Sequence, residues 1–229
     1  MRSTKTNVTG KTNVAGPAPG IRLLRVILFI LAFIGIAMVV RRTLVIEGII
    51  ASFTPGGGTP FDTGFAKHPV ITFLHIIPGA LFMILAPLHF IPRVRARYPV
   101  FLRRSERVLL FAAGIIGLSA LCMPFIFLPI GGINEAAASI FYAVVFLLAL
   151  GKVWQYFSAK EETLHREWLI RLVAIGLAIA TIRPIIALFF AFSGQPPQVF
   201  FGTAFWIGFT LHLIFAEVWI HYTRKPVNQ

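Results

Sequence analysis

Six long apolar runs make up most of this 229-residue chain, and they constrain its fold more than any other feature. A helix needs about 20 apolar residues to cross about 30 Å of hydrocarbon, and each run is close to that length. Only 13% of the residues are charged, against about 25% in a soluble domain. The sequence therefore predicts an all-α polytopic membrane protein, a single bundle of six transmembrane helices. The predicted spans lie near Leu23–Val40, Pro69–Ile91, Arg107–Ile130, Ala136–Phe157, Trp168–Phe192 and Val199–Tyr222.

Basic residues are concentrated in alternate connections between these spans. The N-terminal segment, the second and fourth connections and the C-terminus are rich in Lys and Arg, whereas the third and fifth connections contain neither. Cytoplasmic loops carry an excess of Lys and Arg, so both termini are predicted to be cytoplasmic. Arg41 and Arg42 are the exception, because this topology places them outside. The net charge of +13 comes mostly from the ends of the helices, and it does not indicate binding to nucleic acid.

The chain divides into one membrane domain and two tails. Residues 1–21 are rich in Thr, Asn, Gly and Pro without periodicity, so they are predicted to be a disordered cytoplasmic tail. Residues 22–223 form the six-helix domain, and residues 224–229 form a second cytoplasmic tail. The long outer connection, residues 41–68, contains a Thr-Pro-Gly-Gly-Gly segment, and the sequence leaves its structure open.

Arg183 and His75 are predicted to lie at similar depths in the fifth and second spans. An Arg at this depth has to face the bundle interior or a wet cavity and find acceptors there. Pro184 removes a backbone donor from the next position, and the carbonyls that it opens, Thr181, neutral His75 or a bound anion are candidate partners. We interpret His75, Arg183 and Thr181 as a polar pocket. The alternative is a structural hub of hydrogen bonds around Arg183.

The histidines suggest haem as a second chemistry. His75 and His89 lie about 40° apart on one helical face, as two b-haem ligands on one helix do. The candidate partners His212 and His221 lie about 180° apart on the sixth span, and His212 does not match His75 in depth. This geometry disfavours two haems and leaves His212 without a partner. One haem b between His89 and His221 stays open, with interfacial anchoring of both histidines as the alternative.

Ionisable residues also gather at the inner ends of the last two spans. Glu217 and His221 lie four residues apart on one helical face, and Arg171 lies at a similar depth on the fifth span. An ion pair between Arg171 and Glu217 would neutralise both side chains. The functional alternative is a gate for protons or substrate.

Several motifs in the last five spans resemble a known family. The most specific is His-Arg-x-Trp-x-Ile-Arg at residues 165–171, and the others include Ala-Pro-Leu-His-Phe at 86–90 and Ala-Glu-x-Trp at 216–219. Over roughly residues 66–222 the chain resembles domain-of-unknown-function family 2306. The resemblance implies a multi-pass protein of the bacterial cytoplasmic (inner) membrane, without an established activity.

The resemblance also separates two kinds of position. The family pattern has glutamine where this chain has His89, asparagine at His212, histidine at Leu102 and glycine at Glu106. The positions at which this chain agrees with the family pattern include the pocket residues, and the resemblance implies that the others form a cluster on the cytoplasmic side. The agreeing residues are His75, Arg103, His165, Arg166, Arg171, Arg183 and Glu217.

These patterns favour the binding or passage of a small solute, an anion or protons through the intramembrane pocket. We expect the pocket to open on the cytoplasmic side, near Glu217 and Arg171. The alternatives are a single-haem redox protein and an accessory or assembly subunit without a ligand. An enzyme is not favoured, because we find no nucleophile–base–acid constellation and no convincing set of metal ligands. The lipid bilayer is the one partner that the sequence implies directly, and the oligomeric state is left open.

Overall fold

The computed structural model describes residues 19–46 and 60–224 of the chain. The predicted N-terminal tail lies outside these residues except for its last three positions. Residues 47–59, which are much of the predicted outer connection, also lie outside them. So do residues 225–229, which are nearly all of the predicted C-terminal tail. Two parts of that connection are described, and both are helical.

Within the described residues, six helices are long and apolar enough to cross a membrane, which confirms the predicted class. The third of them ends in a short 3-10 segment, η1, and two short helices, α2 and α4, lie in the connections. The elements are α1 (Pro19–Ile46), α2 (Pro60–Lys67), α3 (Pro69–Leu85), η1 (Ala86–Phe90), α4 (Pro92–Arg97), α5 (Pro99–Ile126), α6 (Gly132–Ser158), α7 (Glu162–Phe192) and α8 (Pro197–Thr223).

Most helices begin at a proline, and this moves some boundaries away from those predicted. Pro99 starts α5 eight residues before the predicted start at Arg107. Proline suits the first turn of a helix, because its φ is already helical and its missing N–H would have had no partner there. The basic stretch that follows stays helical, since long Arg side chains extend from the helix into the interface. Helix α1 is also longer than predicted at its C-terminal end, because it continues to Ile46, beyond the predicted end at Val40.

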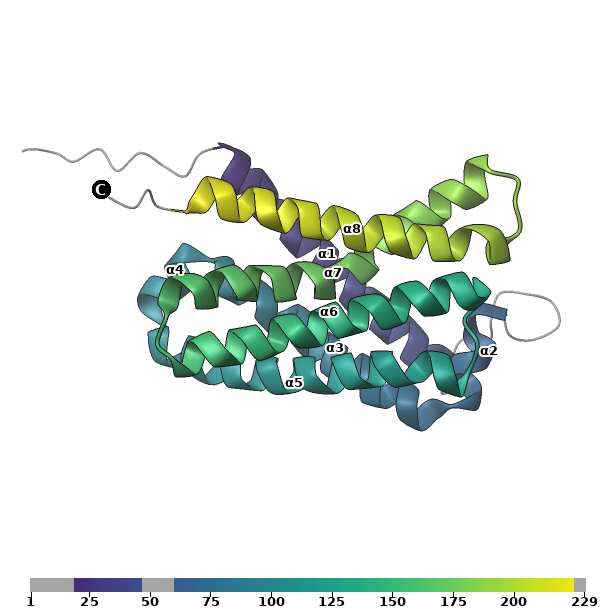
Figure 1. Ribbon diagram of the computed structural model, residues 1–229, viewed down its shortest axis with the longest axis horizontal. Helices are drawn as coiled ribbons and strands as arrows, with labels where there is room; N and C mark the ends of the chain where they lie inside the picture. The colour runs from purple at the N-terminus through teal and green to yellow at the C-terminus, as the bar shows by residue number, and fades with distance from the viewer. Residues whose placement is uncertain (1–18, 47–59, 225–229) are drawn as a thin grey trace, which may run out of the picture.

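The long helices run between two ends of the bundle, as Figure 1 shows. One end holds α4, the α6–α7 connection, the start of α1 and the end of α8, and we call it the basic end. The opposite end holds α2 and the α5–α6 and α7–α8 connections. Helix α7 packs against α1, α6 and α8, while α3 packs against α1 and α5. This arrangement makes α7 the most buried of the six spans and α1 the least buried.

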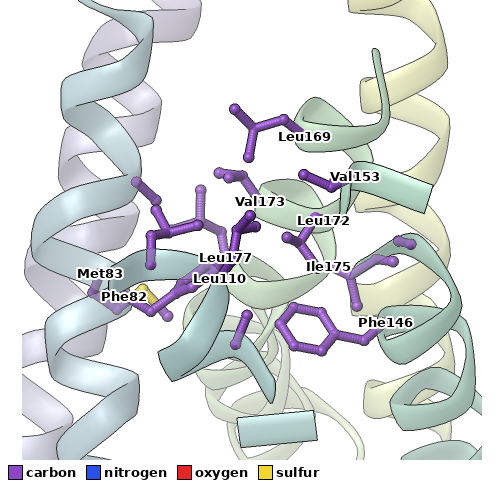
Figure 2. Close-up of a cluster of buried hydrophobic side chains, with 14 of the residues drawn as sticks. Phe82, Met83, Leu110, Phe146, Val153, Leu169, Leu172, Val173, Ile175 and Leu177 are labelled. Atoms are coloured by element: carbon purple, nitrogen blue, oxygen red, sulfur yellow. The ribbon is translucent and has the colours of Figure 1, made fainter. Parts of the chain in front are cut away.

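Side chains from α3, α5, α6 and α7 form the main apolar cluster (Figure 2). Phe82, Leu109, Val153 and Leu172 are almost completely buried in it. In each of these four helices the cluster occupies the part nearer the basic end. A second cluster, centred on Ile182, lies between α7 and α8 nearer the opposite end.

Candidate functional site

A cavity of about 310 Å³ lies inside the bundle, in the part nearer the opposite end. Side chains from α1, α2, α3, α5, α6, α7 and α8 line it, and most of them are apolar. Its ionisable side chains come from four different helices and lie far apart in the sequence. They are Arg42 in α1, His75 in α3, Glu135 and Tyr142 in α6 and Arg183 in α7. The structure thus brings the predicted His75 and Arg183 to one cavity.

His75 is held in the cavity wall by a hydrogen bond to the neighbouring helix. Its Nδ1 lies 2.9 Å from Ser119 Oγ in α5. The Ser119 hydroxyl also lies 2.7 Å from the backbone carbonyl oxygen of Ile115 and 3.0 Å from that of Ile116, and when it donates to either it can accept from the His75 Nδ1–H. In that state the ring carries its proton on Nδ1 and leaves Nε2 as an acceptor.

The sequence patterns did not indicate Glu135 as a site residue, because it was assigned to the connection before α6, which lacks Lys and Arg. It lies instead in the first turn of α6, where its Oε2 accepts a hydrogen bond of 2.7 Å from the backbone N–H of Gly131. The positive end of a helix dipole favours a carboxylate at such a position. The side chain is buried, and the charge of Arg183 acts on it directly. One sequence pattern could have indicated this position: two glycines are followed by an acidic residue, which is typical of the first turn of a helix.

Arg42 accounts for part of the exception to the charge pattern of the loops, whereas Arg41 is exposed. Because α1 continues past Val40, Arg42 lies within the bundle, where only 8% of it is exposed. Its guanidinium carbon lies 4.0 Å from the centre of the Phe65 ring of α2, a cation–π contact. The Phe65 ring in turn contacts Phe127 edge to face, at 5.1 Å between centroids. Helix α2 and the end of α5 thereby contribute to the wall of the cavity.

Thr181 does not belong to the cavity wall that the described residues form. Its hydroxyl lies 2.7 Å from Nε2 of His212, in the interface between α7 and α8. Two residues along a helix correspond to about 200° of rotation, so Thr181 and Arg183 face opposite sides of α7. His212 is buried, and Thr181 is its hydrogen-bond partner there.

The expected opening near Arg171 and Glu217 does not coincide with the cavity described above. In the described part of the chain neither residue lines the cavity, whose wall includes Arg42, Phe65 and Glu135 near the opposite end. The main apolar cluster lies between the cavity and the basic end. The depth of a residue, counted from the predicted inner end of its span, does not show where the packing of the helices leaves a space.

The predicted ion pair between Arg171 and Glu217 is confirmed. Nε and one terminal nitrogen of Arg171 donate to the two carboxylate oxygens of Glu217, at 2.6 and 2.9 Å. The Arg171 guanidinium also lies over the Trp168 ring, 4.7 Å from its centre. A second two-pronged pair joins Arg224 to Glu167, with both bonds at 2.9 Å, and this carboxylate raises the pKa of Arg224.

The other residues predicted for the cytoplasmic-side cluster do not form one site with this pair. Arg103 and Arg166 are exposed, whereas His165 is half-buried. Nε2 of His165 lies 2.5 Å from Oε1 of Glu106, a partner that the sequence analysis did not identify. The predicted cluster therefore separates into two groups, one on α7 and α8 and one on α5, α6 and α7.

The alternative haem ligands have different surroundings. Nε2 of His89 is 3.5 Å from Ser105 Oγ in α5, while His221 is exposed and its ring contacts Tyr222 edge to face. Haem binding between these histidines stays a prediction. Across residues 19–46 and 60–224, no group of three or more His, Cys, Asp or Glu residues is placed to hold a metal ion.

Comparison with known proteins identifies one family. The family model described as "Predicted membrane protein (DUF2306)" matches residues 72–220, which confirms the resemblance found in the sequence. His75, Glu135 and Arg183 lie inside the matched segment, whereas Arg42 and helix α2 precede it. No curated protein and no solved structure matches the chain.

Proposed function

The chain belongs to the family of predicted membrane proteins DUF2306, and we propose that this member binds a small solute in the cavity between its helices. The observation that carries the proposal is the gathering of Arg42, His75, Glu135 and Arg183 around one cavity with mostly apolar walls. Ionisable groups inside a membrane protein are costly, and they mark ligand or ion sites by default. We place the protein in the bacterial cytoplasmic membrane with its basic end toward the cytoplasm.

The chemistry of the wall defines the class of solute. Apolar side chains would contact an apolar body, while Arg183, Arg42 and His75 offer donors and acceptors to a polar head. A guanidinium has five N–H donors, so it can bind a ligand while keeping other contacts, and its fork matches a carboxylate. The cavity volume of about 310 Å³ is near the lower limit of ligand pockets, which is about 300 Å³. The proposed solute is therefore a small amphipathic molecule with a carboxylate or similar head.

The same geometry favours binding over passage through the bundle. The cluster around Phe82, Leu109 and Leu172 lies between the cavity and the basic end, and its members are almost completely buried. A charged solute would have to leave the polar groups of the cavity and cross this cluster without partners, which is unfavourable. A solute bound in the cavity keeps its head near the ionisable groups.

Thermal unfolding of the purified protein in mild detergent tests the proposal. Benzoate and octanoate serve as probes, and benzamide and octanamide serve as uncharged counterparts of similar size. We expect the carboxylates to raise the midpoint of unfolding more than the amides do, because a ligand that binds only the folded state stabilises it. The Arg183→Leu substitution should abolish the increase, because it removes a guanidinium from the cavity wall.

Gly79→Leu separates loss of binding from damage to the fold. A Cβ added at Gly79, which lines the cavity, meets no atom within 4 Å, and we expect a leucine there to occupy the space of the solute. Gly151→Leu is the matched control, because it also meets no atom within 4 Å but lies away from the cavity. We expect Gly79→Leu to remove the response to carboxylates and Gly151→Leu to retain it. No response to any probe in the unsubstituted protein, or an equal response in both variants, would refute the proposal.

A further inference from the structure

A carboxylate and an imidazole meet near the basic end, on the far side of the apolar cluster from the cavity. Glu106 belongs to α5 and His165 to the first turns of α7. Oε1 of Glu106 lies 2.5 Å from Nε2 of His165, and Nδ1 of the same ring lies 3.2 Å from the backbone carbonyl oxygen of Val153 in α6. One imidazole thus joins three helices, and the proposed cavity function does not involve it.

Counting protons at these atoms restricts the state of the pair. The Val153 carbonyl only accepts, so Nδ1 of His165 has to carry a proton. A carboxylate also only accepts, so the contact at Nε2 needs one further proton, on either the ring or the carboxyl group. Both hydrogen bonds of His165 therefore exist together only when the pair holds this proton.

We propose that Glu106 and His165 form a binding site for one exchangeable proton, and that this proton ties the start of α7 to α5 and α6. When the proton leaves, the neutral ring has a single N–H. It can donate either to Glu106 or to Val153, and one of the two contacts is lost. The relative side-chain exposures of His165 and Glu106 are 16% and 11%. Water can therefore reach the site, while neighbouring groups still exclude most of it.

Charged and titratable groups approach the pair from η1 and α7. His89 of η1 and Glu162 of α7 act electrostatically on its members, and Arg95 of α4 acts in turn on His89. From α6 the pair meets only an uncharged group, the Val153 carbonyl, and the Phe157 ring, whose centre is 5.6 Å from that of His165. Positive and negative neighbours are thus both present, and the proton between Glu106 and His165 is the one that decides whether both hydrogen bonds form.

The pH dependence of thermal unfolding tests the site. Between about pH 6.5, the ordinary pKa of histidine, and about pH 9, the midpoint of unfolding of the unsubstituted protein should fall as the shared proton is lost. Glu106→Gln removes the shared proton, so the fall should largely disappear. Glu161→Gln, an exposed carboxylate next to α7, should leave the fall in place. Equal pH profiles for the unsubstituted protein and Glu106→Gln would overturn the proposal.

A second measurement needs no folded Glu106 variant. In protein labelled with ¹⁵N-histidine, the ring signal of His165 is identified by its absence in His165→Gln. At the lower pH, this signal should show a ring with both nitrogens protonated if the shared proton lies on His165. If the proton lies on Glu106, the signal should show a neutral ring protonated at Nδ1. It should change to another state as the pH rises. A His165 ring that keeps one protonation state and one tautomer over this range would contradict an exchangeable proton. This outcome is independent of any solute bound in the cavity.

Discussion

The role of each polar residue inside this bundle depends on which neighbouring helix it faces. His75 and His212 are both histidines within spans, yet His75 lines the cavity and His212 closes a contact between α7 and α8. Thr181 was expected in the pocket because it lies two residues from Arg183 in the sequence. This spacing places the two side chains on opposite faces of α7, and the sequence does not say which helix lies against each face.

The ion pair of Arg171 and Glu217 was easier to predict. The two residues have opposite charges and similar distances from the same end of adjacent spans, and an unpaired charge at such a depth is costly. Glu135 and Arg42 carried no such signal, because both were assigned to loops. Their inclusion in the cavity follows from where α6 begins and where α1 ends, and apolar runs do not define these limits.

The Thr181–His212 hydrogen bond should contribute measurably to stability. Thr181→Val keeps the shape of the side chain and removes the hydroxyl, so a buried nitrogen of His212 loses its partner. We expect a loss of about 1 kcal/mol in the free energy of unfolding, within the range of interhelical hydrogen bonds in membranes. Titration with a denaturing detergent measures it. Thr203→Val, at an exposed position on the same helix as His212, is the control. A similar loss in both variants would mean that the hydrogen bond contributes nothing specific.

At the scale of the helices, hydropathy predicted their number and approximate positions but not their full lengths. Helix α5 includes a basic segment before its apolar run, and α1 includes Arg41 and Arg42 after its own. In both cases the backbone stays helical where the side chains become polar. A window of apolar residues measures the hydrocarbon thickness, whereas prolines and turns set the ends of the helix.

Close contacts between helices depend on glycines that hydropathy does not distinguish. A Cβ added at Gly208 in α8 would lie 2.4 Å from Cγ1 of Ile182 in α7, and one added at Gly176 would lie 2.5 Å from the Phe82 ring of α3. Small residues let helices in membranes approach closely, and packing then supplies much of their attraction. The sequence contains these glycines, but the partners that require them become visible only in the packed bundle.

Gly208→Ala should therefore weaken the α7–α8 interface. Ile182 is fully buried, so it cannot move aside freely, and overpacking of this kind costs about 1–3 kcal/mol. Gly151→Ala is the matched control, because a Cβ there meets no atom within 4 Å. Unfolding in a denaturing detergent should show a loss for Gly208→Ala and little change for Gly151→Ala. Equal stabilities of the two variants would show that α7 and α8 adjust without cost.

For the whole molecule, the sequence predicted the class, the six spans and the family, and all three are confirmed. These features depend on composition and on local patterns, which are present in the sequence itself. The location of the cavity depends on how seven helices pack, and the cavity lies nearer the opposite end than the expected opening at Arg171 and Glu217. The molecule therefore has two chemically different halves, a cavity toward the opposite end and ion pairs at the basic end, with an apolar cluster between them.

The direction of these halves across the membrane follows from the charge pattern and can be tested directly. With the buried position of Arg42 explained, the loops at the basic end carry the excess of Arg and Lys, so this end should face the cytoplasm. Single cysteines are introduced by Ser158→Cys at the basic end and Gln195→Cys at the opposite end. Both positions are exposed, and Cys122→Ala removes the one native cysteine.

A membrane-impermeant maleimide applied to bacterial spheroplasts should label the Gln195→Cys variant. It should label the Ser158→Cys variant only after the membrane is permeabilised, because the reagent cannot cross the bilayer. Labelling of both variants in detergent shows that each thiol is reactive once the membrane is removed. The reverse pattern in spheroplasts would place the basic end outside. The cavity would then lie toward the cytoplasm and the Glu106–His165 pair toward the exterior, so the labelling decides which compartment supplies the solute and which supplies the proton.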